Sequence, residues 1–417
     1  MSEWKEYRLS DVCNKIGSGA TPRGGAESYQ STGEYSLIRS QNVLDYNFTM
    51  KGLAYINEAQ ASKLNNVEVK ERDILLNITG DSVARVCQVP QSVLPARVNQ
   101  HVAIIRPNSD YLTNEYLKYY LLEPSIKDYL LMLSSSGGTR NAITKSMIEE
   151  LVIQAPDLPT QIAIAEILSS LDDKIELNNK INQELETLAQ TLFKQWFIDF
   201  EFPNENGAPY KSSSGEMVES ELGEIPKGWK VETLKDEFVF NMGQSPSGDT
   251  YNTIKDGMIF FQGRSDFGFR FPSIRMYTNA PKKIAKKFET LISVRAPVGD
   301  INMAAEDCCI GRGLGAISHP NQLYTYTYYK VLSIQEVLKS YDNEGTVFGS
   351  INKETLGNIK NIIPPYYLSK SYNDLFCNLD FKITALEKET QELVKTRDAL
   401  LPKLISGELE ILKTIMN

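Results

Sequence analysis

The residue types that most often carry catalysis are sparse in this chain. Only two histidines occur in 417 residues, His101 and His319. A metal site or a nucleophilic triad needs several partners at defined spacing, and neither histidine has a neighbouring set of that kind. His101 lies in an apolar run, so we interpret it as a structural histidine.

Two short runs of the sequence resemble known active-site motifs. The run Gly311-Arg312-Gly313-Leu314-Gly315 lacks the G-x-G-x-x-G spacing of a nucleotide loop and no helical pattern follows it, so we interpret it as a turn. The run Ile363-Pro364-Pro365-Tyr366 differs from the Asp/Asn-Pro-Pro-Tyr motif of amino-methyltransferases at the position that binds the target amino group, and a helix-entry turn is the better interpretation. The sequence contains no P-loop and no convincing nuclease centre. We therefore predict a non-catalytic chain.

The elements around these residues are organised as an internal repeat. Residues 137–200 match residues 345–408 without a gap at an offset of 208 positions, which is the separation of Ile143 from Ile351 and of Pro156 from Pro364. A repeat of this kind predicts a pseudo-twofold molecule whose target or partners also come in twos.

The repeat continues upstream more weakly. Trp4-Lys5 reappears as Trp229-Lys230, the loop 17–22 resembles 243–248, and the run 74–80 resembles 291–297, although the spacing drifts. Matched helices after divergent domains suggest a shared helical scaffold that carries two domains with different recognition properties.

Each repeat ends in a long helix with a heptad-like seam. Apolar residues in the first helix alternate steps of four and three from Ile164 to Trp196, interrupted by Asn178 and Asn182, and the second helix repeats the pattern from Tyr372 to Leu404. Two helices of matched length most economically pair with each other, antiparallel. A buried Asn at such a seam most often fixes the register.

The regions between the helices alternate short β-like runs with turns and helical patches, one of which is predicted at Asn114–Leu122. We predict an α/β protein with two mixed α/β domains separated by two long helices that form an antiparallel coiled coil. The predicted boundaries are 1–157 for the first domain, 158–200 for the first helix, 201–224 for a surface linker, 225–366 for the second domain, and 367–417 for the second helix and tail.

Composition narrows the class of protein. The five cysteines form no CxxC pair and the start of the chain lacks an apolar signal segment, which predicts a cytoplasmic protein without disulfides or a membrane partner. The net charge of −9 is uneven: residues 158–224 carry 4 basic against 13 acidic residues, whereas residues 225–366 carry 17 against 14. The acidic first helix suits a protein partner. The near-neutral domains leave room for a basic DNA-binding face.

Several local signatures, in order, resemble the specificity (S) subunit of type I restriction–modification systems, and the resemblance covers essentially the whole chain. The signatures are Trp4-Lys5 followed by Leu9, Leu192-Phe193-Lys194-Gln195-Trp196-Phe197-Ile198-Asp199-Phe200, Leu222-Gly223-Glu224-Ile225-Pro226-Lys227-Gly228-Trp229, and Leu400-Leu401-Pro402-Lys403-Leu404-Ile405-Ser406-Gly407-Glu408-Leu409.

The resemblance implies a non-catalytic subunit with two target-recognition domains, each of which reads one half of a split, asymmetric sequence of double-stranded DNA. It implies two methylation subunits, which use S-adenosylmethionine, and restriction subunits, which use ATP and Mg. No cofactor and no metal is expected in this chain itself.

Proteins read base edges with Arg for guanine, with Asn or Gln for adenine, and with small hydroxyl side chains. Lys or Arg contacts the phosphates. We expect the DNA contacts in polar loops that follow strands. The residues chosen in this way are Ser18, Thr21, Arg23, Arg39, Gln41, Asn42, Arg85, Arg97, Asn99 and Gln100 in the first domain, and Gln244, Ser245, Gln262, Arg264, Ser265, Arg270, Arg295 and Arg312 in the second.

Two alternatives remain at this point. A self-contained DNA methyltransferase or nuclease would need a cofactor loop and a catalytic motif, which the sequence does not supply. A coiled-coil scaffold that binds only protein would differ from a DNA-recognition subunit in the DNA binding of the assembled complex.

Overall fold

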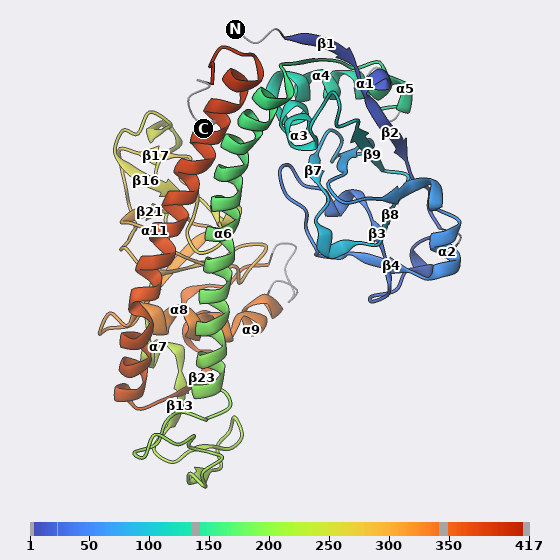
Figure 1. Ribbon diagram of the computed structural model, residues 1–417. Helices are drawn as coiled ribbons and strands as arrows, with labels where there is room; N and C mark the ends of the chain where they lie inside the picture. Colours follow the sequence, from blue (N-terminus) through green and yellow to red (C-terminus); the bar gives the residue numbers. More distant parts are fainter. Residues whose placement is uncertain (1–3, 23, 136–141, 342–348, 412–417) are drawn as a thin grey trace. The chain divides into compact units, whose positions relative to one another are not determined.

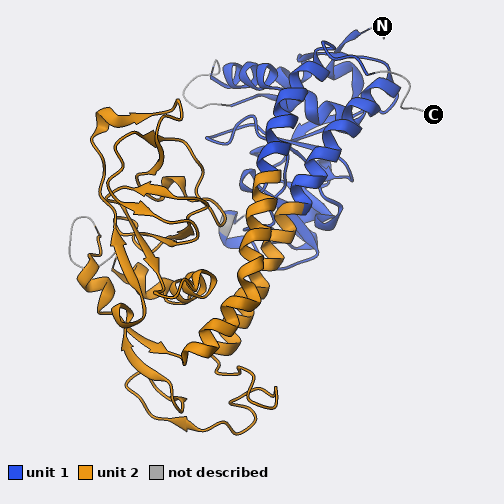
Figure 2. Ribbon diagram, turned by 90° about the vertical axis from the view of Figure 1, so that its left-hand side faces the viewer, with its two compact units in different colours: residues 1–177, 390–417 blue, residues 178–389 orange. Residues whose placement is uncertain are grey.

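The protein is described by a computed structural model that covers residues 4–22, 24–135, 142–341 and 349–411. The chain forms two compact units, Met1–Leu177 with Thr390–Asn417, and Asn178–Glu389 (Figure 2). Each unit contains one mixed α/β domain and one part of both long helices. The glycine-containing loops at 136–139 and 344–346, which begin the sequence repeat, lie outside the described residues.

Two four-stranded sheets form the domain of the first unit, with strand orders β2-β9-β6-β7 and β4-β3-β8-β5. A separate antiparallel pair, β1 with β10, joins the start of the domain to its end. The buried side chains of β6 and β9 supply much of the core. The strands are β1 Lys5–Arg8, β2 Cys13–Ser18, β3 Tyr35–Ile38, β4 Ala54–Ile56, β5 Glu68–Val69, β6 Ile74–Asn77, β7 Val86–Gln88, β8 Ala96–Val98, β9 Val102–Pro107 and β10 Val152–Ala155.

Short helices cover these sheets. The hydroxyl oxygen of Thr113 accepts from the backbone N–H of Tyr116 at 3.2 Å and so caps the first turn of α3. Buried tyrosine and leucine side chains of α3 then pack into the domain core. The helices are α1 Leu9–Val12, α2 Glu58–Ser62, α3 Asn114–Leu122, α4 Pro124–Ser135 and α5 Lys145–Glu149.

The second unit repeats this layout. Its sheets have the orders β14-β22-β19-β20 and β15-β17-β16-β21-β18, and β13 pairs with β23 as β1 pairs with β10. The strands are β13 Lys230–Thr233, β14 Val239–Met242, β15 Tyr251–Asn252, β16 Met258–Phe261, β17 Tyr277–Thr278, β18 Ile284–Ala285, β19 Thr290–Ser293, β20 Ile301–Met303, β21 Cys308–Ile310, β22 Leu314–Ser318 and β23 Lys360–Ile363. The helices are α7 Leu234–Glu237, α8 Tyr324–Ser333, α9 Gln335–Ser340 and α10 Lys353–Gly357.

The two long helices are α6, Leu158–Phe197, and α11, Tyr366–Ile405, and they pack together (Figure 1). Within the second unit the hydroxyl of Tyr372 donates to the carbonyl of Ala189 at 2.7 Å, and Asn178 donates to the carboxylate of Glu389 at 2.9 Å. Residue numbers rise on one helix as they fall on the other, so the pair is antiparallel there. Among the described residues, no helix is long and apolar enough to cross a membrane.

The heptad seam lies where the sequence predicts it. Ile164, Leu168 and Ile175 on α6 are buried, as are Phe376 and Ile383 on α11. The predicted polar breaks in the first helix are buried too, with Asn178 at 0% and Asn182 at 3% exposure. The predicted helix-entry turn before Tyr366 is confirmed, because α11 begins at that residue.

The segment between α6 and the second domain is more ordered than its composition indicates. It contains β11, Met217–Val218, and β12, Ile225–Pro226, which pair antiparallel. Phe202 stacks on Tyr210 and on Trp229, with ring centroids 4.5 and 5.4 Å apart. These aromatic contacts fix a stretch whose Pro, Gly and Ser content predicted a plain surface linker.

Candidate nucleic-acid interface

In the first domain the predicted contact loops gather at one edge of the two sheets. β3 runs parallel to β8 with Ile38 opposite Val98, so the loops that follow both strands leave the same edge. The other sheet contributes there too: Ser18, the last residue of β2, lies opposite Ala103, and Asn77, the last residue of β6, lies opposite Val102. The topology therefore brings together loops that are distant in the sequence.

The second domain builds the same edge from equivalent strands. β16 runs parallel to β21 with Phe261 opposite Ile310. Met242 at the end of β14 lies opposite Gly315, and Ser293 at the end of β19 lies opposite Leu314. The loops after these strands hold all of the residues predicted to contact DNA in this domain, including Arg270 in the long loop between β16 and β17.

Strand registers align the two edges residue by residue. Val98 and Ile310 hold the same place in their sheets, so Gln100 corresponds to Arg312, two residues later in each chain segment. A backbone hydrogen bond repeats in the same frame: the residue after β8 donates to Ile38 at 3.0 Å and the residue after β21 donates to Phe261 at 2.8 Å.

A second pair of positions aligns through isolated bridges. Thr79 pairs with Ala142, and Arg295 pairs with Ser350. Ala142 and Ser350 are themselves 208 positions apart, the offset of the sequence repeat. Thr79 in the first domain therefore corresponds to Arg295 in the second.

Two glycines allow the loops to approach each other closely. A Cβ atom added at Gly19 would lie 1.6 Å from the carbonyl oxygen of Val98, and one added at Gly243 would lie 2.1 Å from that of Gly311. No side chain fits at either position without movement of the backbone. Thr21 and Ser245 each follow two residues later, so the two loops present a hydroxyl at the same place.

Hydrogen bonds in the first domain link two exposed and two half-buried polar side chains into a chain. The Thr21 hydroxyl donates to the Gln100 side-chain oxygen, and the Gln100 amide lies 2.9 Å from Nε2 of His101. Nδ1 of His101 contacts the Thr79 hydroxyl at 2.5 Å. The side chain of Gln100 is thus held in place while it remains exposed.

The equivalent surface of the second domain is basic. Arg295 and Arg312 line an open recess of about 630 Å³ together with Asn352 and Lys353. Ser245 accepts from the backbone N–H of Arg312 at 3.2 Å, which fixes the loop beneath the guanidinium. Within the described part of the chain, the guanidinium groups of Arg295 and Arg312 have no hydrogen-bond or ion-pair partner.

Most of the predicted contact residues lie on or near this edge. Those that are exposed are Ser18, Thr21, Gln41, Gln100, Gln244, Gln262, Arg264, Ser265, Arg295 and Arg312, and those that are half-buried are Arg39, Arg85 and Ser245. Some are already engaged: Arg264 forms an ion pair with Asp300, and both Arg39 and Gln41 donate to the carbonyl of Gly52. Arg23 lies outside the described residues.

Four of the predicted residues are buried and are not available to DNA in this structure. Asn42 and Asn99 turn their side chains inward to organise their own loops: Asn42 donates to the carbonyl of Thr49 at 3.0 Å, and Asn99 accepts from the backbone of His101 at 3.0 Å. The guanidinium of Arg97 donates to the carbonyls of Ala61 and Ala96. We therefore remove these three residues from the predicted interface.

Arg270 is the fourth, and it is fully buried. Its guanidinium donates to Asp380 on α11 at 2.7 Å, to Glu186 on α6 and to the Tyr329 hydroxyl, and it lies 4.0 Å from the ring centroid of Tyr328. Arg270 thus ties its domain to both long helices inside the second unit. Its role there is structural, contrary to the prediction that it reads DNA.

The first unit holds its domain and helices together with a related carboxylate. Asp172 on α6 lies 208 positions before Asp380. It accepts from the Tyr119 hydroxyl at 2.6 Å and from Arg397 on α11 at 2.9 Å. The carboxylate position repeats, whereas its arginine partner comes from a helix in one unit and from the domain in the other. Lys118 of the first domain also pairs with Asp172, at 3.8 Å.

Sequence reasoning missed two members of the edge, Thr79 and Lys353. Thr79 belongs to the run 74–80 that the weak repeat singles out, and Lys353 corresponds to Lys145 at the repeat offset. Thr79 lies in the polar loop after β6, as Arg295 lies in the loop after β19, and Lys353 is the first residue of α10. The repeat marks both residues, and the position of Thr79 in a polar loop after a strand was a second signal for that residue.

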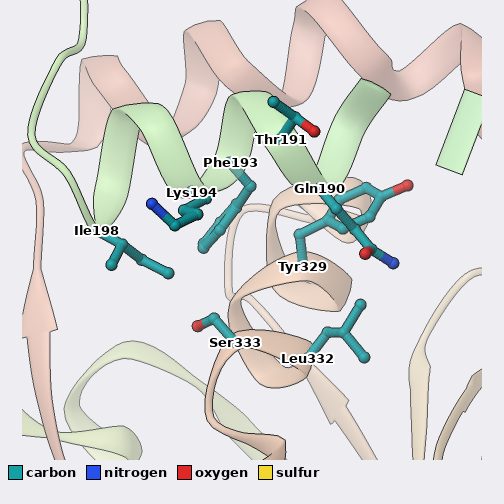
Figure 3. Close-up of a pocket in the computed structure, with 8 residues that line it drawn as sticks. All are labelled: Gln190, Thr191, Phe193, Lys194, Ile198, Tyr329, Leu332 and Ser333. Atoms are coloured by element: carbon teal, nitrogen blue, oxygen red, sulfur yellow. The ribbon is translucent and has the colours of Figure 1, made fainter. Parts of the chain in front are cut away.

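A separate hollow of about 330 Å³ lies within the second unit between α6 and α8 (Figure 3). Its wall includes Phe193, Ile198 and Leu332, with Lys194 and Gln190 beside them. None of the predicted DNA contacts lines it. The hollow is therefore not part of the loop edge.

Comparisons with known proteins give one consistent family. A model described as "Type I restriction modification DNA specificity domain" matches residues 1–187 and 226–396. The chain is 28% identical over 417 residues to the putative type I restriction enzyme MjaX specificity subunit of Methanocaldococcus jannaschii, covering 98% of this chain and 94% of that protein. It is 25% identical to the HindI specificity subunit of Haemophilus influenzae, covering 98% and 100%.

A solved structure supports the fold. The crystal structure of the type I restriction–modification system S subunit from M. genitalium matches with a TM-score of 0.62 at 17% identity, covering 97% of this chain and 96% of that one.

Proposed function

Because the chain belongs to the family of type I restriction modification DNA specificity domains, we propose that each of its two domains reads one half of a bipartite, asymmetric sequence of double-stranded DNA. The protein is the DNA-recognition subunit of a type I restriction–modification complex. The named relatives are specificity subunits, which are not themselves catalytic.

One observation carries the proposal that both domains read DNA. The same strands deliver loops to the same edge in both domains, while equivalent positions carry different side chains, such as Gln100 against Arg312. A common scaffold with different hydrogen-bonding groups is what two readers of two different half-sites require. A scaffold that binds only protein has no need of this arrangement.

We assign the partners by the chemistry that the chain lacks. Two methylation subunits with S-adenosylmethionine would supply adenine methylation, and restriction subunits with ATP and Mg would supply cleavage. The helices are the proposed docking surface for these subunits. In support, Glu166, Asp173, Glu176 and Glu184 of α6 are exposed, and this acidity disfavours contact with phosphates.

The test is to express the chain with its methylation subunits and map the methylated adenines in genomic DNA. We expect a bipartite motif that disappears when this chain is omitted. Replacement of residues 1–157 by the corresponding domain of a relative should then change only one half of the motif. A change in both halves would contradict the assignment of one reader to each half.

Two further assays separate the alternatives. Methyl transfer by the isolated chain with S-adenosylmethionine would show a self-contained methyltransferase. Equal DNA binding by the complex with and without this chain would show a scaffold instead.

A further inference from the structure

We propose that Gln100 and Arg312 occupy one and the same reading position in the two domains, and that they select adenine in one half-site and guanine in the other. This inference rests on the proposed function and adds base identity to it. Thr79 and Arg295 form a second equivalent pair beside them.

The equivalence comes from backbone register and does not depend on similarity between the loops. Both residues lie two positions after a strand that runs parallel to its neighbour, β8 beside β3 and β21 beside β16. Both also contact the hydroxyl-bearing residue that follows the close-approach glycine. Thr21 donates to the side chain of Gln100, and Ser245 accepts from the backbone of Arg312.

The hydrogen-bonding capacity of Gln100 matches adenine. A glutamine amide has two N–H donors and two acceptor positions on its oxygen. The Thr21 hydroxyl uses one acceptor position, and Nε2 of His101 at 2.9 Å takes one N–H. One donor and one acceptor remain, and adenine presents N7 as an acceptor and N6–H₂ as a donor in the major groove.

The histidine can support this arrangement in one neutral tautomer. If Nε2 of His101 accepts from Gln100, the ring proton lies on Nδ1, which contacts the Thr79 hydroxyl at 2.5 Å. The chain of hydrogen bonds then fixes on which side of the Gln100 amide group the oxygen lies and on which side the nitrogen lies. Fixed orientation is what allows an amide to distinguish adenine from the other bases.

Arg312 offers the complementary chemistry. Its guanidinium presents a planar fork of N–H donors, which matches the O6 and N7 acceptors of guanine. The side chain is exposed, and the described residues supply no carboxylate or carbonyl partner for it. Arg295 and Lys353 around the same recess add positive charge, which favours close approach of the DNA.

The experiment uses the assembled complex and a library of duplexes in which each position of the mapped motif is varied in turn. We expect an A·T pair in the first half-site and a G·C pair in the second whose replacement weakens binding by about 5- to 150-fold. Arg312→Gln should move the preference at that one position of the second half from guanine to adenine. Gln100→Arg should do the reverse in the first half.

Two controls make the result decisive. Arg312→Lys keeps the charge but loses the planar fork, so it should weaken the discrimination while retaining binding to all sequences. Lys230→Gln changes an exposed charge on β13, away from the loop edge, and should leave the motif unchanged. If Arg312→Gln fails to assemble, Arg312→Lys still tests the inference.

The possible failures are distinguishable. Absence of any bipartite motif for the unmodified complex would overturn the proposed function before a variant is made. A clear motif with a uniform loss of affinity in Arg312→Gln would place the residue on a phosphate and overturn only the inference. Unchanged preferences in both variants would also overturn it.

Discussion

Replacement of Arg270 by methionine should strongly destabilise the second unit. The change removes a fully buried guanidinium and leaves two carboxylates, Glu186 and Asp380, whose side chains are 8% and 3% exposed. Breaking a buried ion pair by removing one partner costs about 3–5 kcal/mol, because the remaining charge stays out of water. We expect a loss in this range at neutral pH.

The assay is urea unfolding of the full-length chain, with hydrogen exchange resolved by peptide to assign the loss to residues 178–389. Lys286→Met is the matched control, because its ion pair with Asp307 is exposed, and it should leave the free energy of unfolding nearly unchanged. Adding Asp380→Asn and Glu186→Gln to Arg270→Met should restore most of the stability.

Acidification provides a second readout for the Arg270→Met variant. Burial raises the pKa of Asp380, and Arg270 opposes this shift. Without the arginine the folded-state pKa rises further, so the penalty should be full at neutral pH and shrink as acid protonates the carboxyl groups. A cost below about 1 kcal/mol at neutral pH, independent of pH, would refute the assignment of Arg270 as the anchor between domain and helices.

Three further outcomes are expected. Burial raises the pKa of Glu387 to about 7, so its contribution to the stability of the second unit should fall as pH rises from about 4.5 to about 7. In unfolding curves measured at a series of pH values, Glu387→Gln should make the stability in this range less dependent on pH. Asp172→Asn should destabilise the first unit by about 1–3 kcal/mol in urea unfolding, because Arg397 is buried beside it, and an unchanged midpoint would contradict this. DNA binding by the assembled complex should weaken steeply as the salt concentration rises. If Arg295 contacts a phosphate, Arg295→Ala should reduce the slope of log K against log salt by about one, which binding titrations at several salt concentrations would measure.

The frame of the protein is predictable from the sequence because it depends on local periodicity. The predicted helical patch Asn114–Leu122 is α3 to the residue, and the seam positions of both long helices are mostly buried. Asn178, expected to lie inside the seam, is 0% exposed. Apolar spacing and turn residues determine these features with little help from distant contacts.

The buried arginines were not predictable in this way. Arg97 and Arg270 have the residue type of DNA contacts, and Arg270 also lies in a loop after a strand, whereas Arg97 lies within β8. Their actual partners depend on tertiary packing: Glu186 and Asp380 lie 84 and 110 positions from Arg270 in the sequence. A sequence pattern does not encode which distant carboxylate will meet an arginine.

The correspondence between loop positions of the two domains could not be predicted from the sequence for a different reason. The offset is 208 in the helices but 212 between Gln100 and Arg312 and 216 between Thr79 and Arg295. Insertions in the loops shift equivalent positions out of phase, and only strand register restores them. The sequence could therefore indicate the kind of residue at the edge but not which residues correspond.

The glycines at the loop edge limit how the specificity of this protein can evolve. A side chain at Gly19 or Gly243 would collide with a neighbouring backbone carbonyl, whereas nearby positions such as Gln100 and Arg312 are open to solvent. Mutations at the glycines would disturb the backbone of the loop edge, but mutations beside them would, under the proposed assignment, change only which base is preferred. Under this assignment, single substitutions on an unaltered backbone would be enough to change the recognition sequence.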